Sequence, residues 1–263
     1  MNTQSDHNVK RIVVKIGSST LTHDNGNLNL HRIELLARTL SDIKNSGIEV
    51  VLVSSGAVSA GIARLHLQRR PASVEEKMAL AAVGQSELMR IYETFFGSYG
   101  HTVAQILMTK DVVDNPVRRV AAENTFLTLL SMGCIPIVNE NDSVSYDEIK
   151  FGGNDTLSAY VSMVCHADLL INMTDIDGYY DSDPRKNPDA KLIERVDVID
   201  EDVYRAAGGA GSDKGTGGMQ SKIQAADLVT RIGIPMFIVN GTDPTVLYSV
   251  LDNTARGTLF AAR

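Results

Sequence analysis

The chain has 263 residues, of which 43% are hydrophobic and 22% are charged, and its formal net charge is −7. This length is enough for a full core in one large α/β domain or two small ones. No stretch approaches the roughly 18 to 20 apolar residues that span a bilayer, and an acidic chain without basic blocks is not typical of nucleic-acid binding. We therefore expect a cytoplasmic protein with neither a membrane nor a nucleic-acid partner.

Apolar, β-branched runs alternate with amphipathic segments along the whole chain. Such runs are typical of strands covered on both faces, as in a parallel sheet. In chain order, we predict strands over 11–16, 49–54, 101–108, 134–139, 168–173 and 235–240. Helical patterns cover 30–46, 75–96, 117–132, 155–166, 218–232 and 244–251. The alternation predicts a three-layer α/β/α sandwich with a central, mainly parallel sheet.

We predict that residues 1–263 form a single domain with two halves. The turn-rich stretch TDIDGYYDSDP at 174–184 marks a soft boundary between a half over about 9–173 and a half over 174–263. Ligands of open parallel sheets bind at the carboxyl ends of the strands. The loops that follow the predicted strands are therefore where chemistry is expected.

Lys15 stands at the end of the first strand, in the stretch KIGSS. It is either a solvent-reaching lysine in a tight turn or part of an anion site. Lys15 shares a strand face with Val13 and Gly17. A lysine on a strand covered on both faces is costly unless it meets a negative partner, so the strand predicts such a partner.

Polar residues follow three further strands. Ser55 and Gly56 lie in VSSGAVSAG, which indicates either a serine helix cap or an anion site at a helix start. Residues 140–155 are rich in carboxylates, which either belong to a polar hairpin or receive an ammonium group. Thr174 and Asp175 are either a plain strand exit or part of a ligand site.

Glycine makes up six of the thirteen residues from Ala206 to Gly218, and a helical pattern resumes directly afterwards. A flexible linker would not require a helix to begin at its end. The residues at that helix start have free N–H groups, and Lys222 leans back toward them because helical side chains point N-terminally. The segment therefore predicts a loop that closes over nucleotide phosphates.

Several common catalytic motifs are absent from the sequence. There is no G-x-x-x-x-G-K-[ST] loop, no G-x-G-x-x-G fingerprint, no G-x-S-x-G elbow and no H-E-x-x-H pair. The two cysteines fit neither a metal-ligand spacing nor a disulfide framework. The chain is therefore not a P-loop enzyme, a dinucleotide-fingerprint enzyme, a serine hydrolase of that type or a zinc protease.

Six motifs together resemble the glutamate 5-kinases of the amino acid kinase family over about residues 9–260. The motifs are VVKIGSS, VSSGAVSAG, LAAVGQSELM, VNENDSVSYDEIKFGGNDTLSA, MTDIDGYYDSDPRKNP and GTGGMQSKIQAA. The resemblance implies ATP-dependent phosphorylation of the side-chain carboxylate of L-glutamate to glutamyl 5-phosphate, the first step of proline biosynthesis. Two alternatives stay open: a kinase of another small amino acid or acid, and a catalytically silent amino acid or nucleotide sensor.

The resemblance also implies roles for individual residues. Lys15 and Lys222 would neutralise the transferred phosphoryl group, and Asp155 would orient both lysines. Mg²⁺ would be carried mainly by the phosphates of ATP, with no metal ligand from the chain. The implied glutamate site comprises Ser55, Gly56, Asn139, Asp142 and Asn154. The implied ATP site comprises Lys15, Thr174, Asp175, Thr216, Gly217, Gly218, Met219, Gln220, Ser221 and Lys222.

Further family traits are implied beyond the site. Proline would act as a feedback inhibitor, glutamate-5-semialdehyde dehydrogenase would act downstream, and the protein would be a homo-oligomer. Because the sequence ends at GTLFAAR, we expect a short form without the additional C-terminal PUA domain of many members. One position departs from the family pattern, since Gly153 replaces the aspartate of the usual Gly-Asp-Asn-Asp loop. The departure leaves Asp155 in place. It removes a carboxylate that the resemblance implies near the amino group of glutamate, so we expect it to affect the affinity for glutamate.

Overall fold

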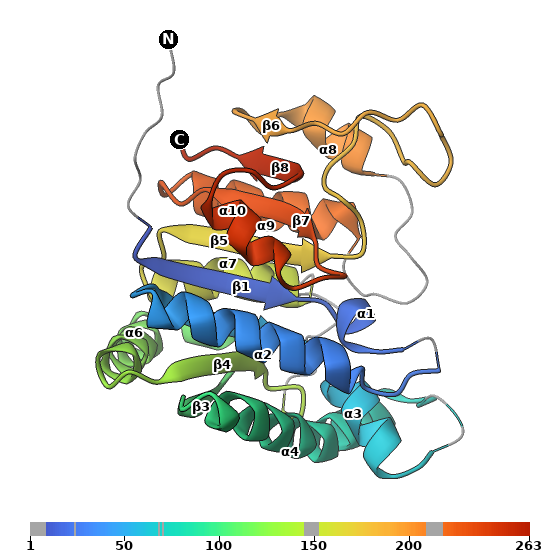
Figure 1. The fold of residues 1–263 in the computed structure, drawn as a ribbon. Coiled ribbons are helices and arrows are strands. Elements are labelled where there is room, and N and C mark those ends of the chain that lie inside the picture. The colour runs from blue at the N-terminus through green and yellow to red at the C-terminus, as the bar shows by residue number, and fades with distance from the viewer. Residues whose placement is uncertain (1–8, 24, 68, 70, 145–152, 209–217) are drawn as a thin grey trace.

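A twisted eight-stranded sheet with helices on both faces forms the body of the molecule (Figure 1). The structure is a computed structural model, and it describes residues 9–23, 25–67, 69, 71–144, 153–208 and 218–263. The predicted three-layer α/β/α sandwich is confirmed. Within the described part of the chain, no helix has the length and apolar character needed to cross a membrane.

The sheet has the strand order β3-β4-β2-β1-β5-β7-β8-β6. All neighbouring strands pair in parallel except β7 and β8, which are antiparallel, so that β8 and its parallel partner β6 run against the other strands. All six predicted strands are present, whereas β6 and β8 were not predicted. The strands are β1 (Arg11–Ile16), β2 (Glu49–Ser54), β3 (Val103–Met108), β4 (Ile135–Glu140), β5 (Leu169–Thr174), β6 (Arg195–Val196), β7 (Met236–Asn240) and β8 (Gly257–Phe260).

Local sequence signals set the ends of the main helices. Ser73 caps the longest helix by accepting a hydrogen bond from the backbone N–H of Glu76 at 3.2 Å, as the capping-box spacing predicts. Gly47 follows another helix with a φ of 101°, which favours glycine. The helices are α1 (Ser18–Leu21), α2 (Leu30–Asn45), α3 (Ala57–Arg64), α4 (Val74–Ser98), α5 (Lys110–Asp114), α6 (Pro116–Ser131), α7 (Asn154–Val164), α8 (Glu201–Ala207), α9 (Met219–Thr230) and α10 (Val246–Leu251).

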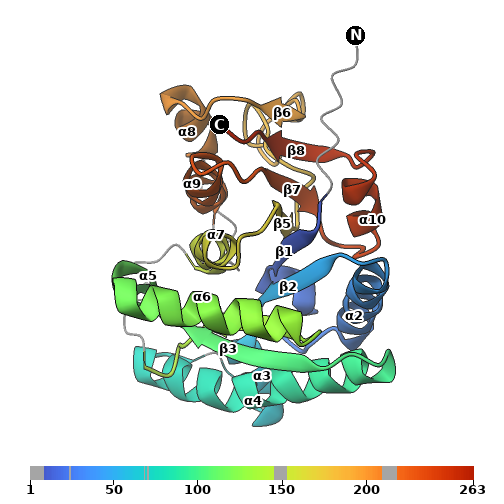
Figure 2. The same ribbon diagram turned by 90° about the vertical axis from the view of Figure 1, so that its left-hand side faces the viewer.

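The two faces of the sheet have separate apolar cores. Ile12, Val14 and Ile16 of β1 pack with the buried residues of α2, α4 and α10. Val13 packs on the other face, with the buried residues of α6, α7 and α9, and Figure 2 shows the two helical layers on opposite sides of the strands. Because side chains alternate along a strand, Lys15 lies on the same face as Val13. Its side chain is therefore directed toward the layer of α7 and α9.

A close helix crossing fixes the start of α3 against α4. A Cβ atom at Gly84 would lie 1.7 Å from the carbonyl oxygen of Ala57, and one at Gly61 would lie 2.1 Å from the carbonyl oxygen of Leu80. Only glycine allows the two backbones to approach this closely. The β2–α3 turn is thereby held in a fixed position relative to α4.

Candidate active site

Two lysines from distant parts of the chain meet one buried carboxylate at the carboxyl ends of the central strands. Lys15 Nζ of β1 lies 2.6 Å from Asp155 Oδ1, and Lys222 Nζ of α9 lies 3.1 Å from Asp155 Oδ2. Asp155 is 1% exposed and each lysine is 6% exposed. Asp155 and Lys222 belong to the first turns of α7 and α9. Both helix starts therefore direct their partial positive charge toward the same point.

The Asp155 carboxylate accepts from two further donors, which are neutral. Asn172 Nδ2 lies 2.8 Å from Oδ1, and Ser221 Oγ lies 2.7 Å from Oδ2. Each oxygen thus has one ammonium group and one neutral donor, which fills the roughly four lone-pair positions of a carboxylate. Asp155 is held in place from four directions and has no position left for another proton or cation.

Burial and charge act against each other in this cluster. Burial alone would raise the pKa of the Asp155 carboxyl, but Lys15, Lys222 and the hydrogen bonds outweigh it and hold the pKa well below its usual range. Burial lowers the pKa of Lys15 from its ordinary value, and the charge of Lys222 acts in the same direction while Asp155 opposes both. Asp155 is consequently ionised at neutral pH and is not a proton acceptor.

A hydrogen-bond relay adjoins this cluster and contains three of the predicted substrate residues. Asn154 Nδ2 lies 2.8 Å from Ser55 Oγ, 2.8 Å from the carbonyl oxygen of Ser54 and 3.0 Å from Asn139 Oδ1. Asn139 Nδ2 in turn donates to Gln85 Oε1 of α4 at 2.9 Å. Four elements, β2, α4, β4 and the start of α7, are thereby joined next to Asp155.

The remaining predicted substrate residues lie beside the relay. Gly56 precedes α3 with a φ of 100°, a backbone conformation that favours glycine. Asp142 lies on the wall of a cavity of about 790 Å³ together with Ala57, Gln85 and Glu140. Asp142 thus shares a cavity wall with Gln85 of the relay.

The backbone before α7 has an unusual conformation. Gly153 is the N-cap residue of α7, with φ 69° and ψ −162°. This region of backbone space is adopted almost only by glycine. The glycine that replaces the aspartate of the family pattern therefore adopts this conformation without backbone strain.

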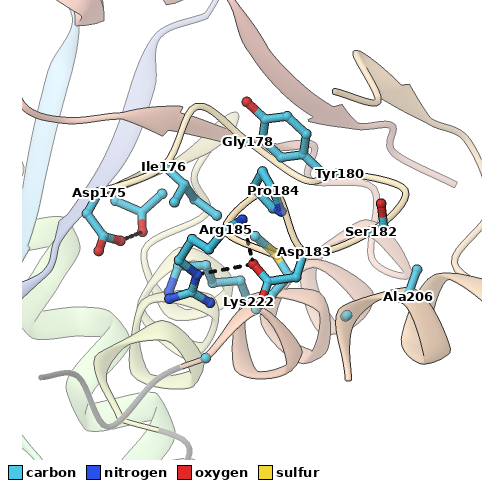
Figure 3. Close-up of a pocket in the computed structure, with 14 residues that line it drawn as sticks. Asp175, Ile176, Gly178, Tyr180, Ser182, Asp183, Pro184, Arg185, Ala206 and Lys222 are labelled. Atoms are coloured by element: carbon cyan, nitrogen blue, oxygen red, sulfur yellow. Dashed lines mark hydrogen bonds and ion pairs between the residues drawn. The ribbon is translucent and has the colours of Figure 1, made fainter. Parts of the chain in front are cut away.

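A second pocket opens on the other side of the charged cluster (Figure 3). Its wall includes Lys222 and the predicted nucleotide residues Thr174, Asp175, Gly218 and Met219. Thr174 Oγ1 donates to Asp175 Oδ1 at 3.1 Å. The sequence analysis did not identify the rest of the wall, which comprises Ile176, Gly178, Tyr180, Ser182, Asp183, Pro184, Arg185, Ala206 and Ala207.

The other predicted nucleotide residues differ in their placement. Gln220 is exposed, and Ser221 directs its hydroxyl to Asp155. Thr216 and Gly217 lie outside the described residues. The cluster of Lys15, Asp155 and Lys222 adjoins the relay through Asn154 and the pocket through Lys222. The predicted nucleotide segment 216–222 is described only from Gly218 onward.

Two polar residues of the site were missed in the sequence analysis. Asn172 interrupts the apolar run of β5 and pairs in register with Lys15, a signal that could have identified it. Gln85 lies within the motif LAAVGQSELM, but its position in a long helix gives no sign of the partner that it meets.

The donor set indicates how a metal ion could be held. Among the described residues, no group of three or more His, Cys, Asp or Glu side chains is placed to bind one. Asp155 already accepts from four donors. A Mg²⁺ ion that enters with a nucleotide would be held by phosphate oxygens, which are common ligands of this ion.

An open α/β sheet with two buried lysines at the carboxyl ends of its strands, beside a pocket, is an arrangement that suits the binding of negatively charged groups. The sequence profile of the amino acid kinase family matches residues 10–240. The chain belongs to the amino acid kinase family.

Individual proteins show the same relationship. The chain is 53% identical to the glutamate 5-kinase of Clostridium perfringens, over 97% of this chain and 96% of the relative. It is 55% identical to the glutamate 5-kinase of Clostridium tetani, over 97% and 95% of the two chains. The crystal structure of UMP kinase from Bacillus anthracis superimposes with a TM-score of 0.65 at 19% identity, over 97% of this chain and 96% of that one. The last likeness concerns the fold alone.

Proposed function

We propose that this protein transfers the γ-phosphoryl group of ATP to the side-chain carboxylate of L-glutamate and forms glutamyl 5-phosphate. The observation that carries this proposal is the identity of 53% and 55% to two glutamate 5-kinases over nearly the whole chain. The site geometry agrees with the chemistry, because the charged cluster adjoins both a pocket that Lys222 lines and the relay, whose Gln85 lines a second cavity.

The proposed reaction needs no general base from the protein. A glutamate side chain has a pKa of about 4.3 and is already an anion at pH 7. One carboxylate oxygen forms a bond to the γ-phosphorus, and the bond from that phosphorus to the β–γ bridging oxygen breaks, so that ADP leaves. The barrier is the repulsion between the carboxylate and the triphosphate. Lys15, Lys222 and the starts of α7 and α9 lower it by positioning and electrostatics.

We assign the two halves of the chain to the two substrates. In residues 9–173, Ser55, Gly56, Asn139, Asp142 and Asn154 would hold glutamate. In residues 174–263, Thr174, Asp175 and the segment 216–222 would hold ATP, with Lys15 contributing from the first half. Mg²⁺, when bound with ATP, would supply positive charge to the phosphates.

A hydroxamate assay tests the proposal. The purified protein is incubated with ATP, Mg²⁺, hydroxylamine and one acceptor from a panel of L-glutamate, L-aspartate, N-acetyl-L-glutamate and carbamate. Hydroxylamine traps an acyl phosphate, and we expect product with L-glutamate. Turnover with a different acceptor would indicate another kinase of the family. Thermal stabilisation by glutamate without any hydroxamate would indicate a sensor.

We also propose the wider setting that the resemblance implies. The protein would act in the cytoplasm at the first step of proline biosynthesis, as a homo-oligomer that proline inhibits. Its product would be consumed by glutamate-5-semialdehyde dehydrogenase. Addition of L-proline to the assay tests the inhibition, and sedimentation of the purified chain tests the oligomeric state.

A further inference from the structure

The side chain of Gln85 is buried in an unusual way. It is 8% exposed, and its Nε2 group meets no hydrogen-bond partner among the described residues. An unpaired buried donor destabilises a fold, and such a group in a native structure requires an explanation. Contribution to stability is therefore not a sufficient reason for glutamine at this position.

The other end of the same amide has a definite partner. Gln85 Oε1 accepts from Asn139 Nδ2 at 2.9 Å. Asn139, which is 3% exposed, uses its own Oδ1 to accept from Asn154 Nδ2 at 3.0 Å and from the backbone N–H of Glu140 at 2.9 Å. Gln85 thus helps to hold the Asn139 amide in this orientation, because rotation of that amide would break all three contacts at once.

The helix that carries Gln85 is tightly fixed to the opposite side of the relay. Gly84, the preceding residue, packs against the carbonyl of Ala57 at the start of α3. On the same helix, the hydroxyl of Tyr92 lies 2.8 Å from Ser54 Oγ. Helix α4 therefore presents Gln85 from a rigid position to residues of β2, β4 and α7.

We propose that Gln85 is a positioning residue for the acceptor substrate. It holds the Asn139 amide so that Asn139, Asn154 and Ser55 keep the arrangement in which they receive the acceptor. This inference rests on the proposed function only in that the protein phosphorylates an acceptor, whichever acceptor that is. It assigns Gln85 a role in acceptor affinity, with no part in nucleotide binding.

The substitution Gln85→Met tests the inference, since methionine has a similar shape and its thioether is only a weak acceptor for Asn139. Loss of one buried partner predicts that KM for glutamate rises roughly 10- to 100-fold, while kcat and KM for ATP stay near their wild-type values. The unfolding midpoint should change little, because the unpaired donor at Gln85 is exchanged for one at Asn139. The matched control is Thr230→Val, which removes another buried unpaired polar atom, at the far end of α9, and should leave all three kinetic constants unchanged.

A double-mutant cycle separates positioning from general packing. If Gln85 acts through Asn139, Gln85→Met should have no further effect on KM in an Asn139→Ala background. Where turnover is too slow, calorimetric titration with glutamate replaces KM. Unchanged KM in Gln85→Met, or an equal additional loss in the double variant, would overturn the inference. A lowered unfolding midpoint with unchanged KM would indicate a purely structural residue.

The same series distinguishes this inference from the proposed function. The ratio of variant to wild type is measured with whichever acceptor the wild-type protein phosphorylates. A different preferred acceptor overturns the proposed function and leaves the test of Gln85 intact. A wild-type protein that phosphorylates no acceptor overturns both.

Discussion

Replacement of Lys222 by methionine should separate the contribution of the charged cluster to catalysis from its contribution to stability. The cluster contains two ammonium groups and one carboxylate, all at least nine-tenths buried. Lys222→Met leaves Lys15 paired with Asp155, whereas Asp155→Asn leaves two ammonium groups without a carboxylate. Lys222→Met therefore removes one positive charge from the cluster, whereas Asp155→Asn removes its negative charge.

The expected magnitudes follow from this difference in charge. Loss of one preorganised charge stabiliser typically lowers kcat by about 10²- to 10³-fold, so Lys222→Met should fall in this range. Its free energy of unfolding should change by only about 1 kcal/mol, because no buried charge is left uncompensated. Asp155→Asn should lose about 3–5 kcal/mol of unfolding free energy, the usual effect of an uncompensated buried charge, as well as activity.

Three measurements check this reasoning: steady-state kcat at saturating ATP and glutamate, urea unfolding, and the pH dependence of kcat. The charge of Lys222 helps to lower the pKa of Lys15, so Lys222→Met should raise that pKa. The alkaline limb of the kcat profile should then move to higher pH. Near-wild-type kcat in Lys222→Met, or a loss of stability equal to that of Asp155→Asn, would refute the assigned arrangement.

Three further predictions concern stability. The pKa of Asp155 is low in the folded state, so the unfolded chain binds more protons at this residue and stability should be lost as the pH falls below about 4. Urea unfolding at about pH 7 and pH 3 measures this loss. The loss should be larger in the wild type than in Asp155→Asn. Gly84→Ala should lower the free energy of unfolding by about 1–3 kcal/mol, since its Cβ meets the Ala57 carbonyl. The Cβ of Gly97→Ala in the same helix meets open space, so this variant should raise the free energy of unfolding by about 0.5–1 kcal/mol. Equal effects of the two variants would contradict the close helix crossing. Gly153→Asp should cost about 1–3 kcal/mol through backbone strain, and an unchanged midpoint in thermal unfolding would show that the turn accepts a side chain.

The main architecture was predictable because buried parallel strands are apolar along their whole length. β1, β2, β4 and β5 are buried almost throughout, and their sequences show it as continuous apolar runs. β6 has two residues and β8 has four, which is too short for a period to emerge. Their reversed direction depends on pairing with distant residues, and a local pattern does not encode pairing.

The candidate site was predictable to a similar extent. Residues at the ends of parallel strands share one edge of the sheet, which is why Lys15 and Thr174 could be considered together. The partnership of Gln85 with Asn139 spans 54 positions and depends on how closely α4 approaches α3. A single glutamine in an amphipathic helix resembles any polar surface residue until that approach is known.

The four hydrogen-bond donors that surround the Asp155 carboxylate imply that phosphoryl transfer and acceptor selectivity depend on different residues. A group with four fixed neighbours cannot adapt to the incoming substrate, so under the proposed roles the charged cluster would serve different acceptor anions alike. Selectivity for the acceptor would then arise in the neighbouring relay and cavity, which belong to other segments of the chain. New acceptor preferences could accordingly be engineered there while the transfer machinery stays untouched.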